Sequence, residues 1–259
     1  MPLKVLRFMH DKAITPFERA KATLLVGAVF FCMRSCEYLN VSNAKQKKTK
    51  ALCLRNIRFF RDGTEIKSKL AKCLRDVDIV SITFEDQKNG DKFDTVNLQS
   101  SNDPLLCPLK AWANTVSRIS EYPGTTRDTP VNVYMCGKRF LQISDKSVIQ
   151  SLRSAVHLIG EESLGFKASE VGTHSIRAGG AMAMYLAHPQ IPTYTIQLIG
   201  RWRSDAFLKY IRKQVKQFTA HISNSMVENE GFSHIPEYSK TSPTKIRMAG
   251  SPKCDRKKE

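Results

Sequence analysis

The feature that most constrains this chain is an apolar helix with a clear start signal. Thr15 is a good N-cap residue, Pro16 suits the first helical position, and Glu18 completes a capping box. Beyond this start, residues 24–33 are almost entirely apolar. That run is far shorter than the roughly 20 residues needed to cross a bilayer. The sequence therefore predicts a helix in the centre of a globular core.

The rest of the chain predicts short strands followed by several helices. Strands are expected at 57–61, at 80–85, where apolar and polar residues alternate, and at 93–98. Asn89-Gly90, typical of a hairpin turn, lies between the last two strands. Further helices are expected at 109–119, 144–159, 173–187, 192–199 and 204–215, with Ser144 and Thr173 as N-caps. The expected fold class is α+β, mainly helical, with one small antiparallel sheet.

A net charge of +17 over 259 residues is the strongest compositional signal. Most of the excess lies before residue 220, so a basic tail does not account for it. A protein this basic attracts polyanions, and nucleic acid is favoured over a membrane surface. Charged residues interrupt the start of the chain, which therefore does not read as a signal peptide. We expect an intracellular protein.

The seven cysteines are scattered and form no Cys-x-x-Cys pair. In a reducing compartment this pattern predicts free thiols rather than a disulfide framework or a zinc site. No metal site is expected.

Two segments carry residues suited to phosphate binding. Arg34 follows the apolar helix directly, although the ordinary interpretation is an ion pair with Glu37 in the same turn. His174 and Arg177 share one face of a predicted helix near its N-terminus, where an imidazole beside a guanidinium could hold a phosphate. Gly179-Gly180 inside that helix predicts the close approach of another backbone or a ligand.

A third segment, 198–212, ends in a tyrosine among basic residues. Tyr210 lies late in a short predicted helix, between Lys209 and Arg212. Taken alone, it reads as an ordinary tyrosine with its hydroxyl at the surface.

The order of these pieces resembles the active-site array of the tyrosine recombinase (phage integrase) family. The similarity covers about residues 14–215 and is most specific over 174–212. It looks closest to recombinases of eukaryotic mobile elements of the Crypton or DIRS kind. The residues that carry the resemblance are Arg34, Lys88 at the hairpin turn, His174, Arg177, Trp202 and Tyr210.

The resemblance implies an integrase-like catalytic domain that cuts and rejoins DNA without metal, cofactor or ATP. Tyr210 would attack a phosphodiester, forming a 3′-phosphotyrosyl bond and releasing a 5′-hydroxyl. Arg34 and Arg177 would hold the non-bridging oxygens of the transition state. His174 would add a donor and assist proton transfer, and Lys88 would protonate the leaving oxygen.

Two positions depart from the family pattern. The family usually has His or Trp directly after the glycine, nine residues before the tyrosine. Arg201 occupies that place here, and Trp202 lies eight residues before Tyr210. Both remain candidates, with Trp202 ranked first as the brace of the nucleophile. For the lysine, Lys92 is an alternative to Lys88.

The expected organisation is a linker remnant at 1–13, a catalytic domain at 14–220 and a flexible basic tail at 221–259. The family normally carries a helical core-binding domain ahead of the catalytic one. We therefore expect either a fragment or a gene that has lost that domain. The resemblance implies double-stranded DNA as partner, a homotetramer on DNA, and a nuclear location in a eukaryotic host. Two alternatives stay open: a DNA-binding remnant without activity, and type IB topoisomerase-like relaxation.

Overall fold

The protein is described from a computed structural model that defines residues 1–42, 51–87, 90, 92–187, 191–204 and 208. These residues belong to one compact unit, 1–213. Helices predominate and the strands pair antiparallel, which confirms the α+β class. Lys88, Tyr210, the 220/221 boundary, the tail and most of the helix expected at 204–215 lie outside the described residues.

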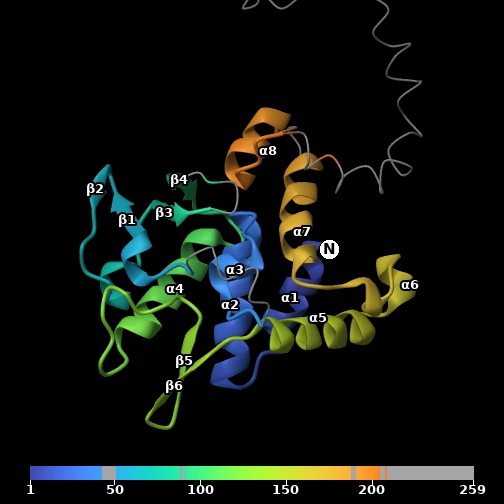
Figure 1. Ribbon diagram of the computed structural model, residues 1–259, viewed down its shortest axis with the longest axis horizontal. Coiled ribbons are helices and arrows are strands. Elements are labelled where there is room, and N and C mark those ends of the chain that lie inside the picture. The colour runs from blue at the N-terminus through green and yellow to red at the C-terminus, as the bar shows by residue number, and fades with distance from the viewer. Residues whose placement is uncertain (43–50, 88–89, 91, 188–190, 205–207, 209–259) are drawn as a thin grey trace, which may run out of the picture. The chain divides into compact units, whose positions relative to one another are not determined.

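The predicted central helix is α2, Pro16–Phe30. The Thr15 hydroxyl accepts a hydrogen bond from the Glu18 amide at 3.2 Å, and the Glu18 carboxylate accepts one from the Thr15 amide at 3.0 Å. This capping box and the buried run from Leu24 to Val29 confirm the prediction. Helix α4, Pro108–Ser120, packs beside α2, with the Trp112 ring edge-on to Phe31 (Figure 1).

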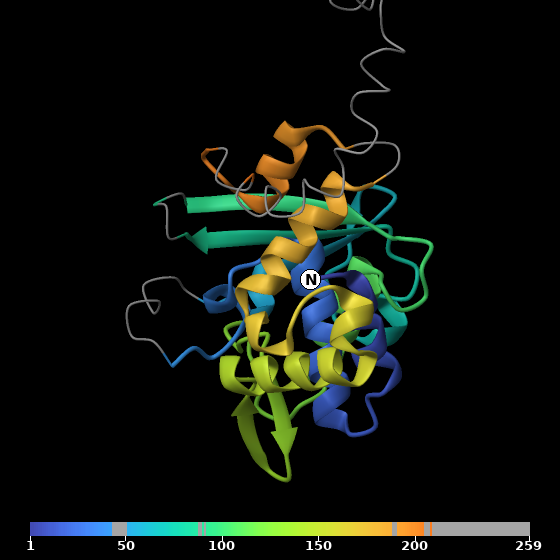
Figure 2. The same cartoon turned by 90° about the vertical axis from the view of Figure 1, so that its right-hand side faces the viewer.

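The larger sheet has the strand order β2-β1-β3-β4, all antiparallel. Its strands are β1 Ile57–Arg61, β2 Thr64–Glu65, β3 Ile79–Asp86 and β4 Lys92–Gln99. The predicted strands at 57–61, 80–85 and 93–98 are confirmed, whereas β2 was missed because two residues carry no periodicity. Helix α4 contacts β3 and β4, and α8, Thr193–Gly200, lies on the other side of the sheet (Figures 1 and 2).

A second, two-stranded sheet corrects the expectation of a single one. Strands β5, Val133–Cys136, and β6, Arg139–Gln142, form a separate hairpin. All four residues of β6 are exposed, so this strand lacks the alternating apolar pattern that marks a half-buried strand.

Residues 1–13 were expected to be a linker remnant, but they include a helix that packs into the core. Residues Leu3–Asp11 form helix α1, in which Val5 and Leu6 are fully buried. Helix α1 packs against α2 and α5, Asp145–Ile159, and Arg7 pairs with Asp103. This helix was not predicted because only two of its residues are fully buried, which is too few to give a clear helical repeat of apolar residues.

Helices α5, α7 His174–Tyr185 and α8 confirm the helices predicted at 144–159, 173–187 and 192–199. Five short helical elements in the described part of the chain were not predicted: α3 Ser35–Tyr38, α6 Glu161–Leu164 and the 3₁₀ turns η2 Leu54–Asn56, η3 Ala71–Cys73 and η4 Ala168–Glu170. Ser144 caps α5, accepting from the Ser147 amide at 3.2 Å. Thr173 does not cap α7 through its side chain, because its own backbone is already helical. Among the described helices, none is long and apolar enough to span a bilayer.

The glycine pair in α7 allows two other chain segments to approach closely. A Cβ atom on Gly180 would lie 2.2 Å from the Val29 carbonyl oxygen of α2. A Cβ on Gly179 would lie 2.4 Å from the Met1 carbonyl oxygen. The predicted close approach of another backbone is confirmed, and it brings α7 against the end of α2.

Candidate active site

Three arginines from distant parts of the sequence meet where α2, α7 and α8 converge. Arg34 directly precedes α3, Arg177 lies in the first turns of α7, and Arg201 ends α8. Arg177 and Arg201 are buried, with 3% and 4% of their surface exposed, while 18% of the Arg34 side chain is exposed. We call Arg34, Arg177 and Arg201 the arginine cluster.

One buried carboxylate holds two members of the arginine cluster. Glu37 accepts from Arg34 Nη1 at 3.0 Å and from Arg201 Nη2 at 2.7 Å. Its second oxygen also accepts from the Arg34 amide at 2.8 Å. The ion pair expected between Arg34 and Glu37 is therefore present, but Glu37 also binds a second arginine 164 positions away.

Gln87 connects the arginine cluster to the end of β3. Its Oε1 accepts from Arg34 Nη1 at 3.3 Å and from Arg201 Nε at 3.2 Å. Its amide nitrogen donates to Asp94 of β4 at 3.0 Å. The hairpin that is predicted to carry Lys88 thus begins one residue after a side chain bonded to two of the arginines.

Arg177 is fixed by backbone carbonyls rather than by a carboxylate. Its two terminal nitrogens donate to the carbonyl oxygens of Cys32 and Gly200. Its guanidinium lies 4.2 Å from the centre of the Trp202 ring, a cation–π contact. These contacts join the ends of α2 and α8 to α7.

The two candidates next to Gly200 have different surroundings. Arg201 has a left-handed backbone, with φ +54°, and its side chain runs inward over the Phe84 ring at 3.5 Å. It also donates to the Phe31 carbonyl at 3.1 Å. The Trp202 ring instead covers Gly200, where any Cβ atom would collide with it. Trp202 therefore lies against Arg177, while Arg201 holds Glu37 and Gln87 in place.

Positive charge is in excess at this site. Glu37 is the only acidic side chain buried among the residues that the structure describes, and it lies between three guanidinium groups. Burial, Arg34 and Arg201 together lower the pKa of Arg177 to about 10. Burial also lowers the pKa of Arg201, against the opposing effect of Glu37. A bound anion would relieve this repulsion.

The other predicted site residues are less constrained by the structure. His174 is exposed at the first position of α7, and it forms no hydrogen bond or ion pair with a described residue. Lys92 is exposed at the start of β4, opposite Asp86. The predicted nucleophile Tyr210 and the lysine Lys88 lie outside the described residues.

Gln87 was not predicted as a site residue, and Glu37 was predicted only as the ion-pair partner of Arg34. Gln87 is adjacent to Lys88 at the end of an alternating strand, but a glutamine at a strand end is not a distinctive signal. Glu37 was assigned only to a local ion pair, because its second partner is far away in sequence.

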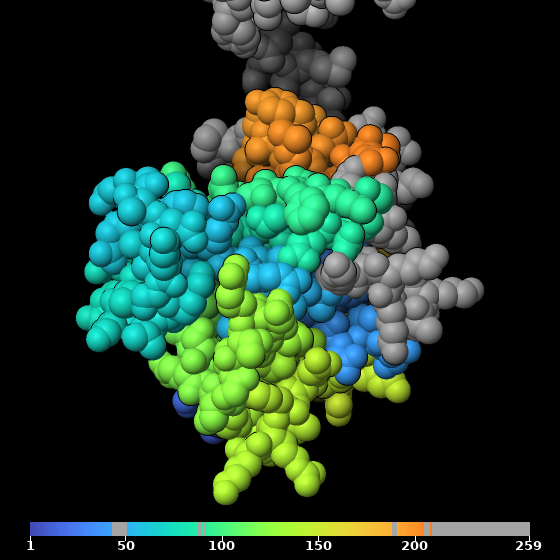
Figure 3. Space-filling model, turned by 60° about the vertical axis from the view of Figure 1, so that its left-hand side comes forward, coloured from blue at the N-terminus to red at the C-terminus, as the bar shows by residue number. Residues whose placement is uncertain are grey.

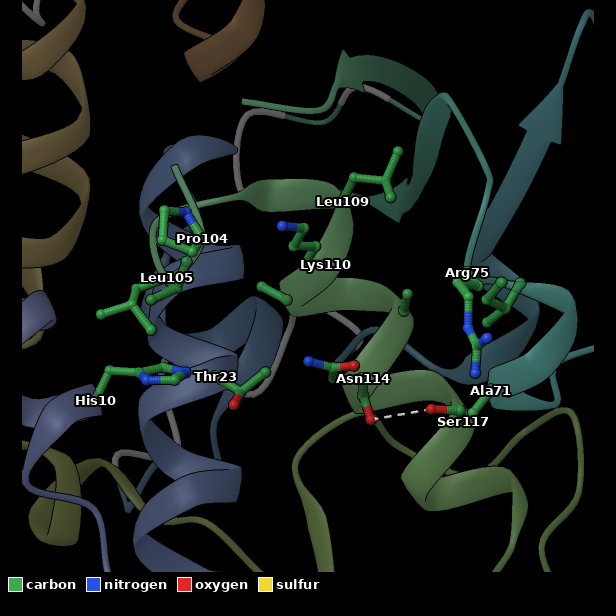
Figure 4. A pocket seen from close by; sticks show the side chains of 14 residues that line it. His10, Thr23, Ala71, Arg75, Pro104, Leu105, Leu109, Lys110, Asn114 and Ser117 are labelled. Atoms are coloured by element: carbon green, nitrogen blue, oxygen red, sulfur yellow. Dashed lines mark hydrogen bonds between the residues drawn. The ribbon is translucent and has the colours of Figure 1, made fainter. Parts of the chain in front are cut away.

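A separate cleft lies between α1, α2, η3 and α4 (Figure 4). Its volume is about 380 Å³, and its polar lining includes His10, Arg75, Lys110 and Asn114. It contains none of the predicted site residues.

Comparison with known proteins gives a structural likeness but no match to a family model or a curated protein. Among solved structures, a chain titled FLP recombinase–Holliday junction complex is similar, with a TM-score of 0.42 and 11% sequence identity. The likeness covers 91% of this chain and 47% of that chain, so this chain spans about half of that recombinase's length.

Proposed function

We propose that this chain is the catalytic domain of a tyrosine recombinase, which cuts and rejoins double-stranded DNA through a 3′-phosphotyrosyl bond to Tyr210. The observation that carries the proposal is the arginine cluster around Glu37. Its members Arg34 and Arg177 come from the two segments whose motifs predict phosphate binding. Three guanidiniums and one carboxylate leave a cationic site suited to a phosphodiester.

The geometry suits transition-state stabilisation. A phosphorane carries more negative charge than the starting diester, and donors already fixed in place stabilise it most. Arg34 uses only Nη1 toward described side chains, so Nη2 and Nε remain for a phosphate oxygen. Toward the described residues, Arg177 uses one N–H on each terminal nitrogen, which leaves further N–H groups that could donate to a phosphate. Arg201, bonded to Glu37 and Gln87, is a positioning residue.

The proposed reaction conserves the energy of the phosphodiester. The Tyr210 oxygen attacks phosphorus, the bond from phosphorus to the 5′-oxygen breaks, and the 5′-oxygen takes a proton from Lys88. A 3′-phosphotyrosine and a free 5′-hydroxyl result. Rejoining reverses these steps with the same or another 5′-hydroxyl. His174 would donate a hydrogen bond to a phosphate oxygen or take the tyrosine proton, and Trp202 would support the nucleophile.

A nicked suicide substrate tests the proposal, because cleavage next to the nick releases a short strand and traps the covalent adduct. We expect wild type to form an adduct that Tyr210→Phe abolishes. Tyr194→Phe is the matched control, since Tyr194 is 64% exposed on α8. We expect Arg177→Lys to lower the cleavage rate, by on the order of 10²-fold, because lysine lacks the planar fork of donors.

The alternatives give different results in the same experiments. DNA binding without an adduct in wild type would overturn the enzyme proposal and leave a DNA-binding remnant. Relaxation of a supercoiled plasmid without products joined from two sites would indicate a type IB topoisomerase-like activity. Products joined from two sites, formed by an assembly of four subunits on DNA, would support the recombinase.

A further inference from the structure

A second concentration of positive charge lies at the β1 side of the sheet. A cleft of about 740 Å³ opens between the start of β1, the segment after β2, and the residues after α4. Figure 3 shows this face, with the cyan residues of β1 and β2 above the green residues that follow α4. Five cationic side chains and one carboxylate line the cleft: Arg55, Arg58, Lys67, Lys69, Arg127 and Glu65. We call it the basic cleft.

Lys69 lies close enough to Arg58 and Arg127 to feel their charges. Lys69 Nζ donates to the Ile57 carbonyl at 2.6 Å, which fixes its ammonium group in the wall. Burial lowers the pKa of Lys69, and nearby Arg58 and Arg127 lower it further, against the effect of Glu65. No described carboxylate forms an ion pair with Lys69, Arg58 or Arg127. The basic cleft therefore holds unneutralised positive charge.

The basic cleft and the arginine cluster are each bonded to residues at the end of β3. Strand β1 starts at the end of the sheet where antiparallel β3 finishes. At this end Glu85 accepts from Arg55 Nε at 2.7 Å, and Arg55 lines the cleft. Gln87, bonded to the arginine cluster, follows Glu85 by two residues, which is about 7 Å along an extended chain. The two cationic sites thus share one end of the sheet.

We infer that the basic cleft binds backbone phosphates of the DNA duplex that flanks the phosphate held by the arginine cluster. The inference rests on the proposed function. An open cleft with cations on several walls suits successive phosphates better than one small anion. Contacts to phosphates set the position and direction of a duplex without reading its bases. The basic cleft would thus align the flanking arm.

The salt dependence of DNA binding tests the inference. Binding of a labelled duplex that carries the nick of the suicide substrate is measured by fluorescence anisotropy in the Tyr210→Phe protein, so that cleavage plays no part. The test variant is Arg58→Ala/Arg127→Ala. The control is Arg75→Ala/Lys110→Ala, which removes two cations that line the cleft of Figure 4.

We expect the test variant to bind more weakly and with a shallower salt dependence. The slope of log K against log salt concentration changes by about 0.9 for each phosphate that the protein no longer neutralises, or about 1.8 for two phosphates. The control should keep the slope of the parent protein. Equal slopes in parent and test variant, or an equal change in the control, would overturn the inference.

Two further measurements keep the result interpretable. Arg58 lies over the Phe60 ring, so its replacement also disturbs packing; Arg127→Glu alone, at an exposed position, should also make the slope shallower. Shortening the duplex arm on one side of the nick should abolish the difference between parent and test variant. A difference that persists with either arm shortened would contradict binding of the flanking duplex.

The two proposals can fail separately. A wild-type protein that forms no covalent adduct would overturn the proposed reaction, whatever the salt slopes are. An unchanged slope in the test variant would overturn the basic cleft even if the adduct forms.

Discussion

At the scale of single residues, the site depends on Glu37. Its carboxylate is 1% exposed and accepts from both Arg34 and Arg201. Burying a guanidinium without a counter-charge is costly, and removing one partner of a buried pair leaves that cost uncompensated. The negative charge of Glu37 therefore offsets the repulsion between Arg177 and the two arginines that Glu37 binds, Arg34 and Arg201.

Replacing this carboxylate by an amide should destabilise the protein strongly. We expect Glu37→Gln to lower the free energy of unfolding by about 3–5 kcal/mol, measured by urea denaturation near neutral pH. Glu121→Gln, at an exposed position after α4, is the control and should change stability by less than about 0.5 kcal/mol. A similar, small change in both variants would show that Glu37 does not neutralise the arginine cluster.

At the scale of elements, the contact between α7 and α2 positions Arg177. Gly180 lies against the Val29 carbonyl, three residues before Cys32, whose own carbonyl accepts from Arg177. A side chain at Gly180 would push the two helices apart. The same movement would pull Arg177 away from its carbonyl partner.

Two glycine substitutions separate this contact from the general effect of replacing glycine by alanine. Gly180→Ala should lower the free energy of unfolding by about 1–3 kcal/mol, because its Cβ meets a backbone oxygen that cannot rotate away. Gly172→Ala is the control, because nothing lies within 4 Å of its Cβ position and its φ is not positive. We expect no decrease there, and a gain of up to about 1 kcal/mol from the stiffer unfolded chain. Equal thermal unfolding curves for both variants would contradict the close packing of α7 on α2.

At the scale of the whole molecule, the positive charge of the arginine cluster comes from helices brought together by folding. The anion site that we propose at the arginine cluster would therefore exist only in the folded protein. A ligand that binds only the folded state stabilises it by mass action.

Inorganic phosphate should therefore raise the melting temperature. At 100 times its dissociation constant, the gain in unfolding free energy is about 2.7 kcal/mol. The reference is sodium chloride at the same ionic strength. Arg34→Gln, at the most exposed member of the arginine cluster, should lose most of the gain, whereas Arg75→Ala/Lys110→Ala should keep it. An equal increase in all three proteins would indicate a general salt effect on burial.

Local signals in the sequence predicted the longer helices and strands correctly, apart from α1. The capping box at Thr15, the alternation in β3 and the Ser144 cap each depend on residues a few positions apart. Such signals act within one turn or one strand, so tertiary structure left them unchanged. They failed at α1 and at β6, where few buried residues carry the pattern.

The candidate site likewise combines features that the sequence predicted with features that it did not. By itself the sequence determined which side chains are available, and the order of its motifs made Arg34, Arg177, Trp202 and Arg201 candidates through their resemblance to the recombinase family. Only the tertiary structure decided that Arg201 turns inward to Glu37 while Trp202 lies on Arg177. The physical reason is that a left-handed residue at the end of α8 sets these directions, and the carboxylate and amide that hold Arg201 lie more than a hundred positions away in the sequence.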